Sequence, residues 1–130
     1  MYKGLLISFL LCSAAIVEAQ LLADRVLIKK SERKLYLVRD GINYRGFPIA
    51  LGPRPRGHKL YVGDERTPEG SYVLDLKYEE SNFYKAIHIS YPNEQDVKRA
   101  AETGVNPGGS IMIHGTPNKA TLPPDLIQKF

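Results

Sequence analysis

The sequence predicts a mainly β domain with one short helix. Three observations favour this class. Short apolar segments that alternate with a period of two recur along the chain. Gly, Pro and Asp residues that form turns separate these segments, and only one stretch, about residues 93–104, has helical spacing. With 130 residues, of which 43% are hydrophobic and 25% charged, the chain has the length and composition of one globular domain.

Residues 1–19 have the composition of a secretory signal peptide. Lys3 supplies the positive charge, Gly4–Val17 is apolar, and small residues form a cleavage site at the end. We therefore expect an exported protein, in the periplasm or cell envelope, whose domain covers residues 20–130. An uncleaved N-terminal anchor is the alternative, although the apolar stretch is short for a membrane span. Cys12, the only cysteine, lies in this segment, so the mature chain would have no thiol.

Three antiparallel strands are predicted in the first part of the mature chain. Alternating apolar residues favour strands at Arg25–Lys30, Lys34–Arg39 and Ile42–Leu51. Asp40-Gly41 predicts a tight hairpin turn between the second and third, because both residues tolerate a positive φ. The three strands should therefore form a meander.

Two loops and two further strands are predicted next. Gly52–Gly57 alternates Gly and Pro with arginines, which indicates a surface loop. Gly63–Gly70 contains Thr67-Pro68-Glu69-Gly70, a sequence that fits a β-turn with Pro at its second position. Period-two alternation then favours strands at Ser71–Tyr78 and Ala86–Tyr91.

The helix is predicted from its ends. Asn93 is a suitable N-cap, Asp96 favours the positive N-terminus, and Gly104 ends the helix. Its apolar stripe is narrow, so we expect the helix to lie on the surface of a sheet. A short apolar run framed by glycines, Gly108–His114, predicts the last strand.

Charge and histidine spacing exclude two classes of function. The net charge of +4 is spread along the chain, and no block of Lys and Arg is dense enough to predict nucleic-acid binding. The three histidines, His58, His88 and His114, do not lie at the spacing of metal ligands, and no cysteine pair supports them. We therefore expect neither a metal nor nucleic acid as a ligand.

His114 is the histidine whose surroundings favour chemistry. It ends a predicted strand just before a turn, and Gly115 would let a substrate or backbone approach closely, with Thr116 beside it. An imidazole is also a suitable general base at neutral pH. The residues alone leave catalysis and packing both open for His114. His88, on a strand face, is interpreted as a hydrogen-bonded packing residue, and His58 as an exposed side chain.

Four motifs resemble those of a known family. They are Lys34–Leu37, Gly63–Gly70, Ile87–Pro92 and Gly108–Gly115. In this order, and over nearly all of the mature chain, they are similar to the YkuD-type L,D-transpeptidase catalytic domain.

The resemblance implies a fold, a substrate and a mechanism. The fold would be a β-sandwich-like or barrel-like sheet domain, and the substrate the stem peptides of peptidoglycan. A cysteine thiolate would attack the L-centre of diaminopimelate, release D-alanine and pass the acyl group to an amine on a second stem peptide or a lipoprotein. His114 would act as base to the thiol. Gly115, Thr116 and His88 are assigned to substrate binding, and no cofactor is implied.

The sequence departs from the family at the nucleophile. The family places a Ser/Thr-x-Gly-Cys motif after the His-Gly pair, whereas residues 115–130 contain no cysteine. We expect a domain truncated at its C-terminus, so that the 130-residue chain is inactive; a true cysteine-less product is the alternative. Two other functions stay open: an L,D-endopeptidase or hydrolase of the same fold, and a non-catalytic secreted module that binds peptidoglycan.

Overall fold

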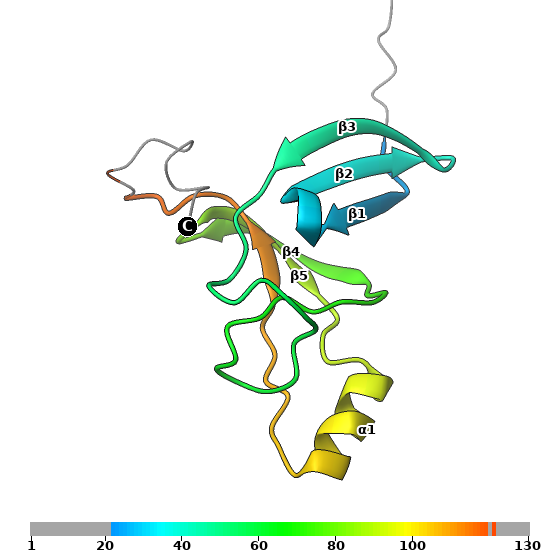
Figure 1. The fold of residues 1–130 in the computed structure, drawn as a ribbon. Coiled ribbons are helices and arrows are strands. Elements are labelled where there is room, and N and C mark those ends of the chain that lie inside the picture. The colour runs from blue at the N-terminus through cyan, green and yellow to red at the C-terminus, as the bar shows by residue number, and fades with distance from the viewer. Residues whose placement is uncertain (1–21, 120, 122–130) are drawn as a thin grey trace, which may run out of the picture.

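The computed structural model describes residues 22–119 and residue 121, so the predicted signal peptide lies outside the described residues. Two three-stranded antiparallel sheets and one α-helix make up the described chain (Figure 1). The predicted class, mainly β with one helix, is therefore confirmed. No helix among the described residues is long and apolar enough to cross a membrane.

The first sheet has the order β1-β2-β3, with bounds Arg25–Lys29, Lys34–Arg39 and Ile42–Pro48. A short 3-10 helix, η1 (Lys30–Glu32), joins β1 to β2. The turn from β2 to β3 is the predicted one: Asp40 has φ +49° and Gly41 φ +77°, the conformation that matches the twist of a hairpin. The third strand ends at Pro48 and not at Leu51, because Pro48 pairs with Lys34, where its partner strand β2 begins.

The second sheet has the order β4-β5-β6, with bounds Leu74–Ser81, Tyr84–Ile89 and Met112–His114. Its first two strands form a hairpin, and β6 pairs antiparallel with β5 on the other side. The predicted strand at residues 71–78 was thus placed three residues early at both ends. The predicted strands at 86–91 and 108–114 were likewise wrong in their bounds, because cross-strand pairing rather than local alternation decides where a ladder starts and ends.

An irregular segment, residues 49–73, connects the two sheets and contains the predicted loops. Its reverse turn lies at Tyr61–Asp64, where Asp64 N–H donates to the Tyr61 carbonyl at 3.3 Å, and not at the predicted residues 67–70. Lys30 ties this segment to the first sheet. Its ammonium donates to the Gly57 carbonyl at 2.6 Å, the Thr67 carbonyl at 2.9 Å and the Glu69 carboxylate at 2.8 Å.

The helix α1 spans Glu94–Thr103, as predicted. Asn93 Oδ1 accepts from Asp96 N–H and Asp96 accepts from Asn93 N–H, which forms a capping box, and Gly104 ends the helix with φ +68°. The expectation that α1 lies on a sheet was wrong. Figure 1 shows the helix beyond the end of the second sheet. Val97, which belongs to the apolar stripe of α1, is half exposed.

The buried apolar core of the described residues is small. Its members with less than a tenth of their surface exposed are Leu35 and Val38 in the first sheet, Ala86 in the second, Tyr91 just after it and Ala100 in α1. The hydroxyl of Tyr91 donates to the Pro107 carbonyl at 3.0 Å, so the largest of these side chains is also satisfied as a donor.

Candidate active site

His114 ends β6, on the outer strand of the second sheet. Its direct partner on β5 is Ala86, and the pairing extends one residue further because Gly115 N–H donates to the Lys85 carbonyl at 3.1 Å. His114 thus stays within a hydrogen-bonded ladder although its side chain is exposed. A solvent-exposed side chain at the end of a strand can contact a substrate without a change in backbone conformation.

The tautomer of the neutral His114 ring follows from one hydrogen bond. Its Nδ1 lies 2.8 Å from the carbonyl oxygen of Gly115. A carbonyl oxygen can only accept, so Nδ1 carries the hydrogen and donates it. In the neutral ring the lone pair is then on Nε2. His114 therefore presents a basic nitrogen of defined orientation.

The tip of the β4–β5 hairpin packs against His114. The Phe83 and His114 rings have centroids 4.4 Å apart and an interplanar angle of 48°. Asn118 N–H donates to the Asn82 carbonyl at 2.9 Å, and the Asn118 side-chain amide donates to the Ser81 carbonyl at 2.7 Å. Asn118 thus attaches the segment that follows His114 to the hairpin through two hydrogen bonds.

Gly115 is required at this contact because a side chain would collide with the hairpin. A Cβ built on Gly115 would lie 2.8 Å from the Phe83 carbonyl oxygen. We expect Gly115→Ala to lower the free energy of unfolding by about 1–3 kcal/mol, the usual cost of overpacking, as measured by urea denaturation. Gly109→Ala is the matched control, since its Cβ would meet its nearest atom at 3.9 Å. Equal stability of the two variants would contradict the contact.

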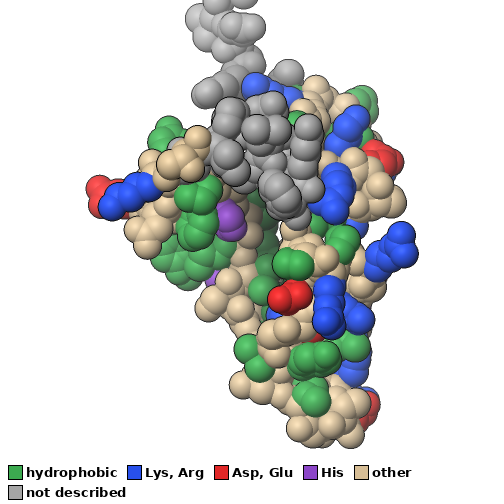
Figure 2. Space-filling view, turned by 60° about the vertical axis from the view of Figure 1, so that its left-hand side comes forward, with side chains coloured by type: hydrophobic (Ala, Val, Ile, Leu, Met, Phe, Trp, Pro, Cys, Tyr) green, Lys and Arg blue, Asp and Glu red, His purple; other side chains and the backbone are tan. Residues whose placement is uncertain are grey.

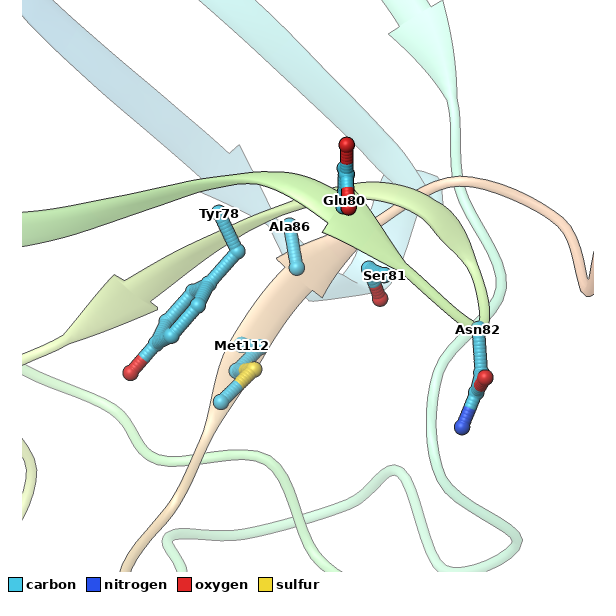
Figure 3. Close-up of a pocket in the computed structure, with 6 residues that line it drawn as sticks. All are labelled: Tyr78, Glu80, Ser81, Asn82, Ala86 and Met112. Carbon is cyan, nitrogen blue, oxygen red and sulfur yellow. The ribbon is translucent and has the colours of Figure 1, made fainter.

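A hollow of about 480 Å³ opens on the face of the sheet that carries His114. Tyr78, Ala86 and His114 are in register across the three strands, so their side chains share one face. Figure 3 shows Tyr78, Met112 and Asn82 pointing to the same side of the sheet. The residues that line the hollow are Tyr78, Glu80, Ser81, Asn82, Ala86 and Met112. Its lining combines apolar side chains with polar ones.

His88 lies on the same face, paired with Met112. Its Nδ1 is 2.6 Å from Oδ1 of Asp75. The register of β4 and β5 shifts by one residue between Leu74 and Leu76, and this irregularity brings Asp75 opposite His88. The hydrogen bond from His88 lowers the pKa of Asp75. The predicted hydrogen bond of His88 is therefore present, but its partner is a carboxylate and not a backbone group.

The other predicted substrate residue, Thr116, is exposed and follows directly after Gly115. His88 and His114 thus lie on one face of the second sheet, and Gly115 and Thr116 follow His114 at the end of β6. Figure 2 shows histidine side chains at the surface beside a group of hydrophobic ones. Asp75 and Phe83 were missed by sequence reasoning, because only the pairing of β4 with β5 places them next to the histidines.

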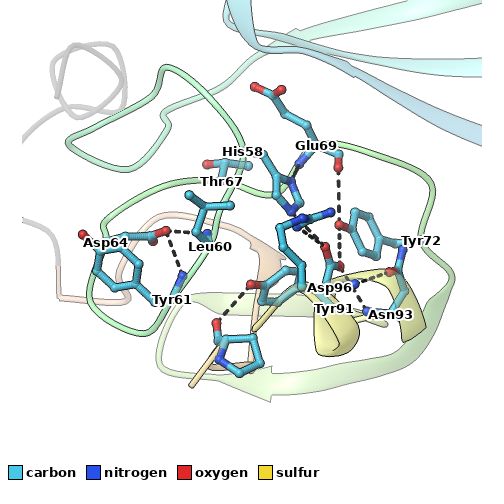
Figure 4. Close-up of polar contacts among 12 residues, drawn as sticks. His58, Leu60, Tyr61, Asp64, Thr67, Glu69, Tyr72, Tyr91, Asn93 and Asp96 are labelled. Carbon is cyan, nitrogen blue, oxygen red and sulfur yellow. Dashed lines mark hydrogen bonds and ion pairs between the residues drawn. The ribbon is translucent and has the colours of Figure 1, made fainter. Parts of the chain in front are cut away.

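His58 does not belong to this site, and the prediction that it is exposed was wrong. Its side chain is only 18% exposed, and both ring nitrogens are engaged (Figure 4). Glu69 N–H donates to Nδ1 at 2.8 Å, so Nε2 carries the hydrogen and donates to Asp96 at 2.8 Å. Asp96 is buried and also accepts from Tyr72, Arg99 and the helix N-terminus. His58 therefore links the irregular segment to α1.

A second buried carboxylate shapes the irregular segment. Asp64 is 2% exposed and accepts from the backbone N–H groups of Leu60, Tyr61 and Arg66 and from the Lys59 ammonium at 2.9 Å. Burial by itself raises the pKa of Asp64, but these hydrogen bonds outweigh it and hold the pKa well below its usual range. Among the described residues no group of His, Cys, Asp and Glu is placed to hold a metal ion.

Comparison with known proteins gives the class of the chain. Residues 23–127 match the YkuD family, described as the L,D-transpeptidase catalytic domain. The chain belongs to this family, and the resemblance found in its motifs is confirmed.

The similar curated proteins come from Escherichia coli. Two proteins named "Putative L,D-transpeptidase YafK", from strain K12 and from O157:H7, are each 35% identical to this chain over 104 residues. The alignment covers 74% of this chain and 40% of each relative, so the chain spans about two fifths of the length of the curated relatives it matches. No solved structure gives a significant match.

Proposed function

We propose that this chain carries the catalytic base of a peptidoglycan L,D-transpeptidase. The observation that carries the proposal is the 2.8 Å hydrogen bond from His114 Nδ1 to the Gly115 carbonyl, which leaves the lone pair on Nε2. A base held in this way can take the proton of a thiol and turn it into a nucleophile. Family membership supports the reaction class.

The proposed reaction is an acyl transfer in two halves. His114 takes the thiol proton, the thiolate attacks the stem-peptide carbonyl, and a carbon–sulfur bond forms. The amide bond to the terminal D-alanine then breaks, and the imidazolium returns its proton to the leaving amine. In the second half a neutral amine of another stem peptide or of a lipoprotein attacks the thioester carbonyl. Its proton passes to His114, the carbon–sulfur bond breaks, and the thiolate is released beside the imidazolium. Gly115, Thr116 and the hollow beside Ala86 would contact the donor peptide.

The proposed place of action is the cell envelope, where the substrate is found. The composition of residues 1–19 supports export, as a signal peptide would provide it. The thiol is proposed to lie in sequence beyond Phe130, because the only cysteine of the sequence is Cys12.

The test begins with the gene and ends with a mass measurement. The DNA beyond codon 130 is sequenced, and the product that carries the following Ser/Thr-x-Gly-Cys motif is incubated with a carbapenem acyl donor. We expect one covalent adduct per chain by intact mass, and none on the 130-residue chain. A stop codon directly after codon 130, or a cysteine-bearing form that neither gains an adduct nor transfers stem peptides, would contradict the proposal. Binding of muropeptides without chemistry would then favour the non-catalytic module.

A further inference from the structure

The second sheet presents two imidazoles on one face, and only His114 transfers a proton in the reaction proposed above. His88 pairs with Met112, and Ala86 pairs with His114. Residues two apart on a strand share a face, so the two histidines lie at opposite corners of a four-residue group. Diagonal neighbours of this kind have Cα atoms about 7–8 Å apart. Ala86, at a third corner, adds no bulk, and the hollow opens there.

His88 is held in the same tautomer as His114, but by a charged group. Because the Asp75 carboxylate accepts from Nδ1 at 2.6 Å, the lone pair of the neutral ring is on Nε2. The carboxylate also stabilises the imidazolium that forms when Nε2 takes a proton, the arrangement found behind a catalytic histidine. The two side chains are 20% and 39% exposed, so a solute can reach the pair.

The charge of this face favours a cation. With neutral His88 the pair has one net negative charge, which comes from the Asp75 carboxylate. The lysines of β4 and β5 point the other way: Lys77 pairs with Ile87, and Lys85 lies two residues before Ile87, on the face opposite His88. Lys85 is engaged there by Glu79 at 2.6 Å. The Asp75 carboxylate therefore faces neither lysine of β4 and β5.

Stability does not account for the pair. An ion pair or hydrogen bond between partly exposed groups contributes about 0–1 kcal/mol, and a backbone carbonyl would satisfy His88 equally well. The register shift that brings Asp75 opposite His88 interrupts the ladder of β4 with β5. Irregularities of this kind commonly redirect a side chain next to a functional site.

We propose that the His88–Asp75 pair receives the primary ammonium group of the acyl acceptor and takes its proton. The inference rests on the proposed transpeptidase function and adds a site for the second substrate. The step is a proton transfer: an N–H bond of the ammonium breaks, a bond from hydrogen to His88 Nε2 forms, and the positive charge moves to the imidazolium beside Asp75. The neutral amine is left within reach of an acyl group held at His114. Asp75 acts through His88 and is a positioning residue.

The experiment measures amine binding on the 130-residue chain, without acylation. The chain is labelled with nitrogen-15 and titrated with Nα-acetyl-lysine methylamide, while the imidazole nitrogens of His88 are followed by two-bond proton–nitrogen correlation spectra. We expect a saturable shift of His88 Nε2. The Nε-acetylated probe, which has no ammonium group, should give no saturable shift.

Two variants test the role of the carboxylate. Asp75→Asn keeps an oxygen that can accept from Nδ1 but removes the charge, so we expect binding at least 10-fold weaker with the nitrogen shifts of the Nδ1–H tautomer retained. Glu79→Gln is the matched control: it removes a carboxylate from the same strand on the opposite face and should bind as the parent chain does. Equal shifts with both probes, or unchanged binding by Asp75→Asn, would overturn the ammonium site.

The outcome is separable from that of the adduct experiment. Probe binding does not require a cysteine, whereas adduct formation does not require an amine. Binding without adduct formation would leave the ammonium site and remove the transpeptidase proposal, and the reverse result would remove only the site at His88.

Discussion

Replacing His114 by alanine in a cysteine-bearing form is expected to slow acylation of the thiol by about 10²–10⁴-fold, the usual contribution of a positioned general base. The reason is geometric. His114 Nδ1 donates to the Gly115 carbonyl oxygen at 2.8 Å, and the centroid of the Phe83 ring lies 4.4 Å from that of the imidazole. These two contacts orient the imidazole and thereby Nε2. Alanine removes the proton acceptor and leaves the thiol protonated at neutral pH.

The rate is measured as the time course of adduct formation with a carbapenem by intact mass. Lys77→Ala serves as control, because Lys77 is exposed on β4 and points away from His114. His114 is exposed, so its replacement should leave the thermal unfolding midpoint within a few degrees of the parent. An unchanged rate in the folded His114→Ala variant would remove His114 from the mechanism.

Replacing Asp64 by alanine is expected to lower the free energy of unfolding by about 3–5 kcal/mol, the cost of removing one partner of a buried ion pair. Lys59, whose side chain is 7% exposed, would lose its counter-ion. The N–H groups of Leu60, Tyr61 and Arg66 would lose their acceptor. Urea denaturation gives the value. The control is Glu65→Ala, since the neighbouring Glu65 is 52% exposed and pairs only loosely with Arg54 at 3.7 Å.

The Asp64 carboxylate makes the stability of the fold depend on pH. The folded pKa of Asp64 is well below its usual range, so the unfolded chain binds the proton more readily than the folded one. The contribution of Asp64 is therefore complete above the unfolded pKa of about 4 and is lost as the pH falls below it. Asp64→Asn should destabilise the chain at neutral pH and flatten its stability between about pH 5 and pH 2. A parent and variant with parallel pH profiles would contradict this account.

Local signals predicted those elements that depend on their own residues. The helix was placed within a residue at each end because Asn93, Asp96 and Gly104 form its caps by contacts inside the same segment. The Asp40-Gly41 turn was correct for the same reason, since its positive φ angles depend on the residue types present. Strand bounds were less accurate. The alternation of side chains around Ser71 does not indicate where β4 starts. Only its pairing with β5, which begins at Leu74, sets that position.

In the candidate site too, contacts between residues close in sequence were predictable, and contacts between distant residues were not. The position of His114 at a strand end, and the Gly115 carbonyl that fixes its tautomer, are one residue apart and follow from the motif itself. The Asp75–His88 contact joins residues 13 apart, and the His58–Asp96 contact joins residues 38 apart. No sequence pattern marked these pairs.

The sequence by itself thus determined the family, the mainly β class, the helix and the histidine that ends β6. The tertiary structure alone decided three contacts: His58 is hydrogen-bonded to the buried Asp96, the Phe83 ring lies tilted against His114, and His88 is hydrogen-bonded to Asp75. The physical reason is the range of the interactions. Caps, turns and strand periodicity depend on neighbours in the chain, whereas partners across a sheet depend on register, and here a shift of one residue between Leu74 and Leu76 places the carboxylate opposite His88.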